Sequence, residues 1–523
     1  YCIEQKEVLK IFEGFPKNGN EKAECHKTEH ETNYFMEHPT IKSFSKKLSL
    51  HTSEKKGRFL KSASHIQKGE VLMKEDPYIF IVLPEYFHSY CANCLSKSIS
   101  LICCEFCPET YWCSERCKAE NWKLIHQYEC GYVEFTESTG IGRLALHVVL
   151  KSGKHEILSC VEDTESDNNI CNAISTADGY SSVYQLVTHL NDVDGEDLQQ
   201  FSFIAALLLT FLEKKSNIFL QESPAAVNKE VDVIGGVLLK HILQLICNSH
   251  AITGLLEYPG TLLKETSVRS VSQVKIASAI YPMASLMNHS CEPNIISSFL
   301  GPCLFVKAVE DIAQDDEIFN CYGPHFRRHS RLERQCALSQ QYHFTCDCLH
   351  CREKSDEVIP ECIKDESKPC GKLREAVREA EFNIECGNAH KALGVLLSSE
   401  SQHTTLRCTN LEILNDIRDN IGKCFAILGN YKKGIEYVDK CQPFVIGKYG
   451  ASSVEVGYEL LKLADLRECL LLKDPNDKSL ADKMMSHLRS AKVIFELQYG
   501  KWSQPFKEVE QKISDLAIRN PGG

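Results

Sequence analysis

The chain has 523 residues, of which 43% are hydrophobic and 25% are charged, and its net charge is −12. This length predicts several domains, and the composition excludes wholesale disorder. The excess of acidic residues argues against a protein that coats nucleic acid through its overall electrostatic field, although a local basic cleft stays possible. No run of about 18 apolar residues occurs, so a membrane-spanning helix is excluded and no membrane partner is expected.

The opening residues carry neither an initiator methionine nor the apolar core of a signal peptide. We therefore expect the numbering to begin inside a longer natural chain. The 27 cysteines occur partly in close pairs and partly alone in apolar surroundings. This usage fits metal ligands and buried thiols of a reducing compartment better than a secreted disulfide framework, so we expect the protein in the cytoplasm and nucleus.

The N-terminal half alternates between strand-like and helical patterns. After a polar start, the segments GRFLKSAS and EVLMKEDPYIFIVL flank a turn at Gln67-Lys68-Gly69 and predict a hairpin. The acidic stretch 152–178 predicts an exposed loop, and apolar spacings of three and four predict helices over 180–250. Residues 277–322 return to short strands.

From about residue 371 onward nearly everything has helical spacing. Residues 428–444 resemble a helix–turn–helix repeat, and residues 385–396 form a weaker copy. KYGASS at Lys448 and QYGKWS at Gln498 mark similar positions about fifty residues apart. A generic helical bundle is the alternative to repeats, and both interpretations predict an α-helical domain.

Four ligand pairs follow one another within forty residues: Cys91 and Cys94, Cys104 and Cys107, Cys113 and Cys117, and His126 and Cys130. Zinc needs four soft or borderline ligands, so eight ligands imply two zinc ions. We predict an interleaved arrangement, with Cys91, Cys94, Cys113 and Cys117 on one ion and Cys104, Cys107, His126 and Cys130 on the other. Cys103 is an alternative to Cys104, which the commoner two-residue gap favours. Free or disulfide-bonded thiols are the bland alternative.

Together with the aromatic pair Tyr111-Trp112, these residues resemble the MYND zinc finger. In that family the finger is a structural or peptide-binding module, which implies proline-containing peptide ligands. A finger alone does not imply an enzyme.

Two later segments carry a further metal pattern. The motif NHSCEPN spans residues 288–294, CYG follows at 321–323, and YHFTCDCLHC spans 342–351. Cys346, Cys348 and Cys351 supply three thiolates, and Cys291 is the natural fourth ligand of a third zinc ion. That ion would tie the two segments together.

NHSCEPN, the later Cys-Tyr and C-x-C-x2-C resemble the SET domain of protein lysine methyltransferases. A MYND finger inserted into a split SET domain resembles the SMYD subfamily, over roughly residues 46–370, and most of all its member with an N-terminal tetratricopeptide array. The resemblance implies an α+β fold with a β-rich SET core and a helical, tetratricopeptide-like C-terminal domain. The expected parts are an unassigned segment (1–45), the SET N-terminal part (46–90), the MYND finger (91–130), a helical insert (131–276), the SET core (277–325), a post-SET zinc region (326–370) and the helical domain (371–523).

The resemblance also implies which residues meet the cofactor, S-adenosylmethionine. Lys56, Gly57 and Arg58 match the N-terminal strand that approaches it, and a missing Cβ at Gly57 would permit close approach. The remaining expected contacts come from the helical insert, the NHSCEPN turn and the aromatic channel: Asn248, Asn288, His289, Tyr322, Tyr342 and Phe344. Phe59 departs from the family pattern, because many SET enzymes have glycine there, and this puts cofactor affinity in doubt.

The implied mechanism is direct methyl transfer to a lysine of a histone or non-histone protein. A lysine amine with an ordinary pKa of about 10.4 must lose its proton before it attacks, and a dry aromatic channel beside a sulfonium lowers that pKa. Tyr322 is the expected catalytic residue. Its hydroxyl would hold the methyl group and the amine in line, without acting as a nucleophile.

Two competing functions belong to other classes. The first is a weakly active or inactive scaffold or transcriptional regulator that binds proline-containing peptides through the finger and partners through the helical domain. The second is a DNA-binding regulator, which is disfavoured because the basic residues form only a short patch: Lys42, Lys46, Lys47, Lys55, Lys56 and Arg58. We expect a monomer that acts on a lysine-containing protein.

Overall fold

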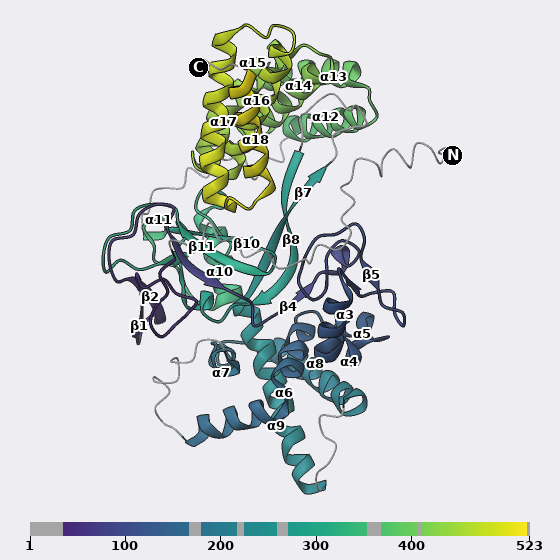
Figure 1. Ribbon diagram of the computed structural model, residues 1–523, viewed down its shortest axis with the longest axis vertical. Coiled ribbons are helices and arrows are strands. Elements are labelled where there is room, and N and C mark those ends of the chain that lie inside the picture. Colours follow the sequence, from purple (N-terminus) through teal and green to yellow (C-terminus); the bar gives the residue numbers. More distant parts are fainter. Residues whose placement is uncertain are drawn as a thin grey trace. The chain divides into compact units, whose positions relative to one another are not determined.

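The computed structural model describes residues 35–166, 179–216, 224–258, 270–352, 368–405 and 410–519. Residues Met36–Gly523 form one compact unit, in which small sheets and many helices alternate along the chain (Figure 1). The expected α+β class is confirmed. Most of the unassigned segment 1–45 lies outside the described residues.

The strands form several small sheets. Two sheets have three strands, in the order β10–β11–β3 and β4–β8–β7, and the two-stranded sheets are β1–β2, β5–β6 and β9–β12. The bounds are β1 Leu48–Ser53, β2 Gly57–Ser62, β3 Val71–Glu75, β4 Ile79–Val82, β5 Ile102–Cys103, β6 Tyr111–Trp112, β7 Ser249–Tyr258, β8 Ser270–Ile280, β9 Asn288–His289, β10 Ile295–Leu300, β11 Cys303–Ala308 and β12 Phe319–Asn320.

The predicted hairpin of β2 and β3 is wrong in its pairing. β2 pairs antiparallel with β1, and β3 pairs with β11 more than two hundred residues away. The segment between β2 and β3 hydrogen-bonds elsewhere, because Ile66 N and Ile312 N each donate to the other residue's carbonyl at 2.9 Å. The predicted turn at Gly69 does exist, with φ at +89°.

Helices pack around the sheets, and short helices also lie within the finger segment 91–130. Their bounds are α3 Glu115–Asn121, α4 Gln127–Glu129, α5 Val133–Ser138, α6 Ile141–Ser166, α7 Tyr180–Tyr184, α8 Gly195–Lys215, α9 Pro224–Asn248, α10 Arg331–Tyr342 and α11 Leu349–Arg352, with short turns η1 Pro84–Tyr86, η2 Trp122–His126 and η4 Ala284–Leu286. The predicted loop over 152–178 is wrong for its first part, because α6 continues past a kink at Gly153 to Ser166. Ile157 is fully buried in the core that α6 shares with α8 and α9, and this burial outweighs the local polarity. Residues 167–178 lie outside the described part.

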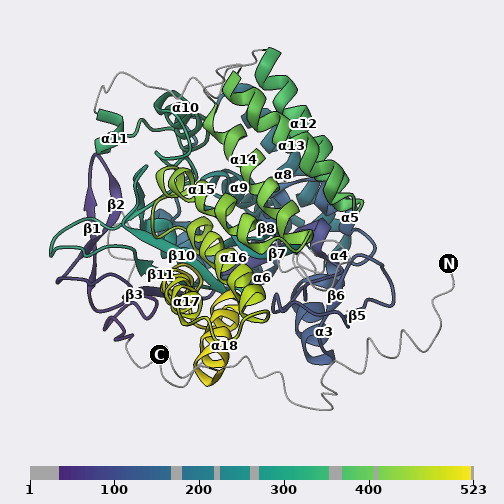
Figure 2. The same cartoon turned by 90° about the horizontal axis from the view of Figure 1, so that it is seen from above.

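The C-terminal region is helical, as predicted. Its helices are α12 Lys368–Glu385, α13 Ala389–Thr405, α14 Leu411–Ile427, α15 Tyr431–Tyr449, α16 Val454–Leu471, α17 Lys478–Tyr499 and α18 Gln504–Arg519. Consecutive helices pack side by side as an array (Figures 1 and 2). The two YG motifs end α15 and α17, where Gly450 and Gly500 adopt φ values of +91° and +87° that only glycine accepts readily. Among the described helices, none is both long and apolar enough to cross a membrane.

Candidate active site and metal centres

The finger gathers two groups of ligands whose atoms lie within 4.8 Å of one another in each group. The first group is Cys91, Cys94, Cys113 and Cys117, and the second is Cys104, Cys107, His126 and Cys130. Both match the interleaved prediction. Within them, Sγ of Cys94 lies 3.5 Å from Sγ of Cys113, and Sγ of Cys104 lies 3.8 Å from Sγ of Cys130. A zinc tetrahedron with Zn–S distances of about 2.3 Å has S···S edges of about 3.8 Å, so both donor sets fit zinc.

Local structure positions these ligands. The side chain of Ser114 caps α3 by accepting from the backbone N–H of Cys117 at 3.2 Å. His126 ends the π-helical turn η2, and its Nδ1 contacts Thr110 Oγ1 at 3.3 Å while Nε2 faces Cys104 and Cys107. A partner on the far ring nitrogen orients a histidine ligand. Cys103 is exposed outside both groups, so the structure supports Cys104 as the ligand.

The third group joins Cys291 to Cys346, Cys348 and Cys351. Sγ of Cys291 lies 3.6 Å from Sγ of Cys351 and 3.9 Å from Sγ of Cys346. The donor set is that of a structural zinc site with four cysteine ligands, and it would tie the NHSCEPN turn to the chain after α10. None of the cysteines in the three ligand groups is bonded to another in a disulfide, which argues against the disulfide alternative.

Arg334 beside the third group escaped the sequence analysis. This residue is buried on α10, and its Nη2 donates to the backbone oxygen of His350 at 2.9 Å and lies 3.6 Å from Sγ of Cys351. Four thiolates around one zinc ion leave a net negative charge, which a guanidinium at this distance would offset. Nothing in the local sequence distinguishes Arg334 from the other basic residues near it.

The NHSCEPN turn and the segment that ends in Tyr322 lie side by side. β9 and β12 pair in parallel, with Asn288 opposite Phe319 and His289 opposite Asn320. The backbone N–H of Tyr322 donates to Nδ1 of His289 at 3.0 Å, and its hydroxyl donates to the carbonyl of Met287 at 2.9 Å. The expected proximity of Tyr322 to the 288–289 turn is therefore present in the structure.

Asn294, the last residue of the same motif, fixes this crossing. Its Nδ2 donates to the carbonyl of Glu317 at 2.9 Å, and its Oδ1 accepts from the backbone N–H of Phe319 at 2.8 Å. The Asn294 side chain thus supplies two hydrogen bonds that tie its own turn to the backbone of the distant segment 317–319. Asn294 belongs to the NHSCEPN motif, and nothing in the sequence alone indicates this role.

Aromatic rings surround Tyr322. The ring of Tyr342 lies 4.7 Å from it, and the hydroxyl of Tyr342 donates to the Tyr322 carbonyl at 3.1 Å. Phe344 contacts both His289 and Tyr322, with ring centroids 6.0 and 6.3 Å apart. Burial raises the pKa of Tyr322 above its ordinary value and that of Tyr342 to about 12. Both phenols therefore stay protonated at neutral pH and can donate hydrogen bonds.

The N-terminal strand contacts this region through Lys56 and the loop after α7 through Arg58. Gly57 has φ at +63°, and a Cβ built there would meet nothing within 4 Å, so its glycine is explained by the turn conformation. Arg58 Nη2 donates to the carbonyl of Gln185 at 2.8 Å, and Lys56 Nζ pairs with Glu317 at 2.5 Å. Phe59 is buried and its ring lies 5.8 Å from that of His51, within the β1–β2 hairpin.

Asn248 ends α9 and faces the loop after α7. Its Nδ2 donates to the carbonyls of Val187 at 3.0 Å and Gln244 at 2.8 Å. The neighbouring Cys247 contacts the carbonyl of Gln341 with its Sγ at 3.3 Å, so the end of α9 adjoins the segment that leads into Tyr342. The loop 185–187 was not predicted as part of this region, since it contributes backbone carbonyls that no sequence pattern marks.

A model of the SET domain family matches residues 57–323, slightly more than half of the chain. The chain belongs to the SET domain family. This family is a family of methyltransferases, and the match covers the residues from Gly57 to beyond Tyr322.

Curated relatives extend the resemblance to most of this SET chain. "Protein-lysine N-methyltransferase SMYD4" of Pongo abelii is 25% identical over 98% of this chain and 74% of its own length. The SMYD4 protein of Mus musculus is 27% identical over 82% of this chain and 65% of its own length. "N-lysine methyltransferase SMYD2" of Homo sapiens is 25% identical over 89% of this chain and 98% of its own length. The predicted SMYD resemblance is confirmed, and the chain spans about two thirds to three quarters of these SMYD4 relatives.

The structure thus brings together most of the residues that the SET resemblance singled out. Asn288, His289, Tyr322, Tyr342 and Phe344 form one group. Lys56 joins it through Glu317 and Asn288. Arg58 and Asn248 meet the loop 185–187 instead. Their contacts with S-adenosylmethionine stay predictions.

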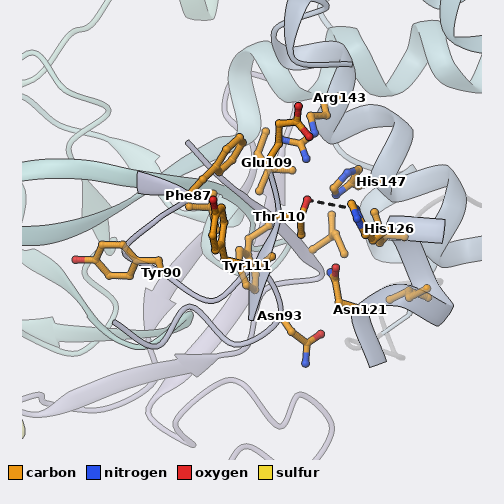
Figure 3. Close-up of a pocket in the computed structure, with 17 residues that line it drawn as sticks. Phe87, Tyr90, Asn93, Glu109, Thr110, Tyr111, Asn121, His126, Arg143 and His147 are labelled. Atoms are coloured by element: carbon orange, nitrogen blue, oxygen red, sulfur yellow. Dashed lines mark hydrogen bonds between the residues drawn. The ribbon is translucent and has the colours of Figure 1, made fainter. Parts of the chain in front are cut away.

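Apart from the group around Tyr322, the protein has a cavity of about 70 Å³ between the finger, β4 and α6 (Figure 3). Glu109, Thr110 and His126 line it from the finger, and Arg143 and His147 from α6. None of the predicted cofactor residues lines this cavity. It therefore belongs to the seam between finger and insert, away from the group around Tyr322.

Proposed function

We propose that this protein transfers a methyl group from S-adenosylmethionine to a lysine side chain of a protein substrate. The observation that carries the proposal is the contact of Tyr322 with residues 287–289, made by two hydrogen bonds and a parallel strand pair. The names of the SMYD4 and SMYD2 relatives support the same reaction.

S-adenosylmethionine, when bound, supplies a methyl group on a positively charged sulfur. The work left to the protein is to dehydrate the amine and to hold it in line, which well-oriented groups can do very effectively. The rings of Tyr322, Tyr342 and Phe344 provide apolar walls that disfavour a charged ammonium, so they lower the pKa of an entering lysine. The Tyr322 hydroxyl stays protonated because burial raises its pKa, so it cannot serve as a base at neutral pH. Its proton is donated to the Met287 carbonyl, and its oxygen can orient a neutral amine by accepting from an amine N–H.

The proposal is tested with labelled S-adenosylmethionine and a panel of histone and non-histone proteins. We expect label transfer by the wild type and a loss of about a hundredfold or more in Tyr322→Phe, because one positioned hydroxyl group is removed. Tyr128→Phe, on α4 of the finger, is the matched control and should keep full activity. Absence of transfer by the wild type, or equal transfer by Tyr322→Phe, would contradict the proposal.

We also propose that the finger binds proline-containing peptides and that the protein is a monomer. Support for the peptide site comes from apolar side chains that the finger leaves in solvent, since Ile99 is 84% and Phe106 is 74% exposed. Titration of a labelled proline-containing peptide should show weaker binding to Phe106→Ser than to the wild type. Light scattering of the purified chain at several concentrations tests the monomer.

A further inference from the structure

Glu317 connects groups that come from two other segments of the chain, the turn at Lys56 and the NHSCEPN motif. It lies two residues before β12, its side chain is 8% exposed, and its two carboxylate oxygens have different partners. Oε1 accepts from Asn288 Nδ2 at 3.1 Å, and Oε2 pairs with Lys56 Nζ at 2.5 Å. Its backbone oxygen accepts from Asn294 at 2.9 Å, which holds the backbone from which the carboxylate extends. The expected cofactor contacts did not include Glu317.

The first consequence concerns the orientation of the Asn288 side chain. An amide can present either its NH2 or its carbonyl oxygen to a neighbour, and the two ends have opposite hydrogen-bonding character. A carboxylate only accepts, so Glu317 selects the NH2 end of Asn288. The Oδ1 atom of Asn288 is thereby left as the end that can accept a hydrogen bond from a bound molecule.

The second consequence concerns the Lys56 ammonium. Besides the ion pair with Glu317, Nζ lies 5.6 Å from the centroid of the Phe59 ring and 5.8 Å from that of Phe319. The lysine side chain is 45% exposed, yet its head group has one buried anion and two aromatic neighbours. Phe59, the departure from the family pattern, therefore helps to hold Lys56.

We propose that Glu317 is a positioning residue for cofactor binding, and that it acts by orienting the Asn288 amide and by holding the Lys56 ammonium. The inference rests on the proposed function, because both partners are predicted cofactor contacts. In this role Glu317 forms no covalent bond and accepts no proton. Its loss should weaken the binding of S-adenosylmethionine while the channel for the lysine substrate keeps its shape.

The test uses the full chain and measures the Kd for S-adenosylmethionine by calorimetry, together with kcat and both KM values. Glu317→Ala removes both contacts, and we expect Kd and the cofactor KM to rise about tenfold or more. Glu317→Gln keeps an oxygen that can accept from Asn288, so it should recover part of that loss. Asp315→Asn removes an exposed charge two residues away and should change Kd less than about twofold.

The readouts separate positioning from a merely structural role. A folding defect lowers kcat through the active fraction and leaves the cofactor KM unchanged, and zinc content and melting temperature report it independently. The inference is overturned if Glu317→Ala binds S-adenosylmethionine as tightly as the wild type, or if kcat falls while the cofactor KM stays constant. If the wild type binds no S-adenosylmethionine, both the proposed function and this inference fall. If the wild type binds S-adenosylmethionine and the Glu317 variants have the same Kd, the inference about Glu317 is wrong and the proposed function still stands.

Discussion

His241 lies in the middle of a buried chain of hydrogen bonds that leads to the loop 185–187. Its Nε2 contacts the hydroxyl of Tyr180 at 3.0 Å, and its Nδ1 contacts Oε1 of Gln244 at 2.7 Å. Gln244 in turn donates through Nε2 to the carbonyl of Leu186 at 2.7 Å. That loop also accepts from Arg58 through Gln185. One buried imidazole thus helps to support a segment to which a predicted cofactor residue is tied.

The first prediction concerns the pH dependence of stability. Burial lowers the pKa of His241 from its ordinary value of 6.5 to about 4. In the unfolded chain the imidazole takes up a proton near pH 6.5, whereas in the folded chain it stays neutral. The stabilising contribution is therefore complete above pH 6.5 and is lost as the pH falls toward 4. Between pH 7.5 and 5.5 we expect a loss of about 1.4 kcal/mol from this group.

The measurement compares the melting temperature at the two pH values in the wild type and in His241→Gln. The wild type should lose more stability on acidification than the variant, and the exposed control His65→Gln should behave like the wild type. Zinc content is followed at both pH values, so that metal loss is not mistaken for the titration. Equal pH slopes in the wild type and His241→Gln would contradict the prediction.

At the residue scale, sequence reasoning succeeds where the chemistry depends on local spacing. The zinc ligands come in short pairs because two ligands from one turn suit a tetrahedron, and their grouping is visible in the chain. Glu317, Arg334 and Gln244 carry no such signature. Each acts through a partner supplied by a distant segment, and a glutamate or arginine with a partner looks the same in sequence as one in solvent.

At the scale of elements, one buried ion pair joins α6 to the finger. Arg143 contacts Glu129 twice, with Nε to Oε1 at 3.0 Å and Nη2 to Oε2 at 3.1 Å, and it also pairs with Glu137. Burial by itself would raise the pKa of Glu129, but Arg143 and His147 hold it below the ordinary value. The pair lies beside the cavity between finger and insert, where Arg143 and His147 come from α6 (Figure 3).

The second prediction is that Arg143→Met strongly destabilises the seam between α6 and the finger. Removing one partner leaves the Glu129 carboxylate buried without its guanidinium, which costs about 3–5 kcal/mol in comparable buried pairs. The double variant Arg143→Met with Glu129→Gln should recover much of the loss, because the uncompensated charge is gone. Melting temperature and the rate of zinc release to a chelator measure both effects. A single variant as stable as the wild type would show that the pair contributes nothing to the seam.

Elements themselves were easier to predict than their partners. Apolar spacing identifies the helices of the insert and of the C-terminal region because each buries a stripe of side chains. The β2 and β3 segments were correctly predicted as strands, yet strand character does not say which strand lies alongside. β3 pairs with β11, which lies more than two hundred residues further along the chain. Which strand pairs with β3 depends on the packing of the whole domain.

At the scale of the molecule, Trp502 links the C-terminal helices to the β10–β11 pair. It follows Gly500 in the second YG motif, and its Nε1 donates to the carbonyl of Phe299 at 3.2 Å. Its ring lies 4.6 Å from that of Phe305, and Lys307 Nζ lies 4.8 Å from its centroid. The same ammonium donates to the carbonyl of Glu496 on α17 at 3.2 Å. The YG motif marked a helix end in sequence, and the structure adds that this end is a contact with the SET core.

The third prediction is that Trp502→Ala loosens α17 and α18 from the sheet and leaves the SET core folded. Because the indole is partly exposed, we expect the free energy of unfolding to fall by roughly 2 kcal/mol. Replacing a fully buried tryptophan by alanine lowers it by about 3–5 kcal/mol. Calorimetry should show the helical region melting earlier, and amide exchange should quicken in α17 and α18 and in β10. Trp502→Phe keeps a ring against Phe305 and loses the hydrogen bond to Phe299, so it should fall between the wild type and the alanine variant. If instead the zinc ligands around Cys291 lose their metal in Trp502→Ala, the two regions fold as one cooperative unit and the contact supports the whole chain.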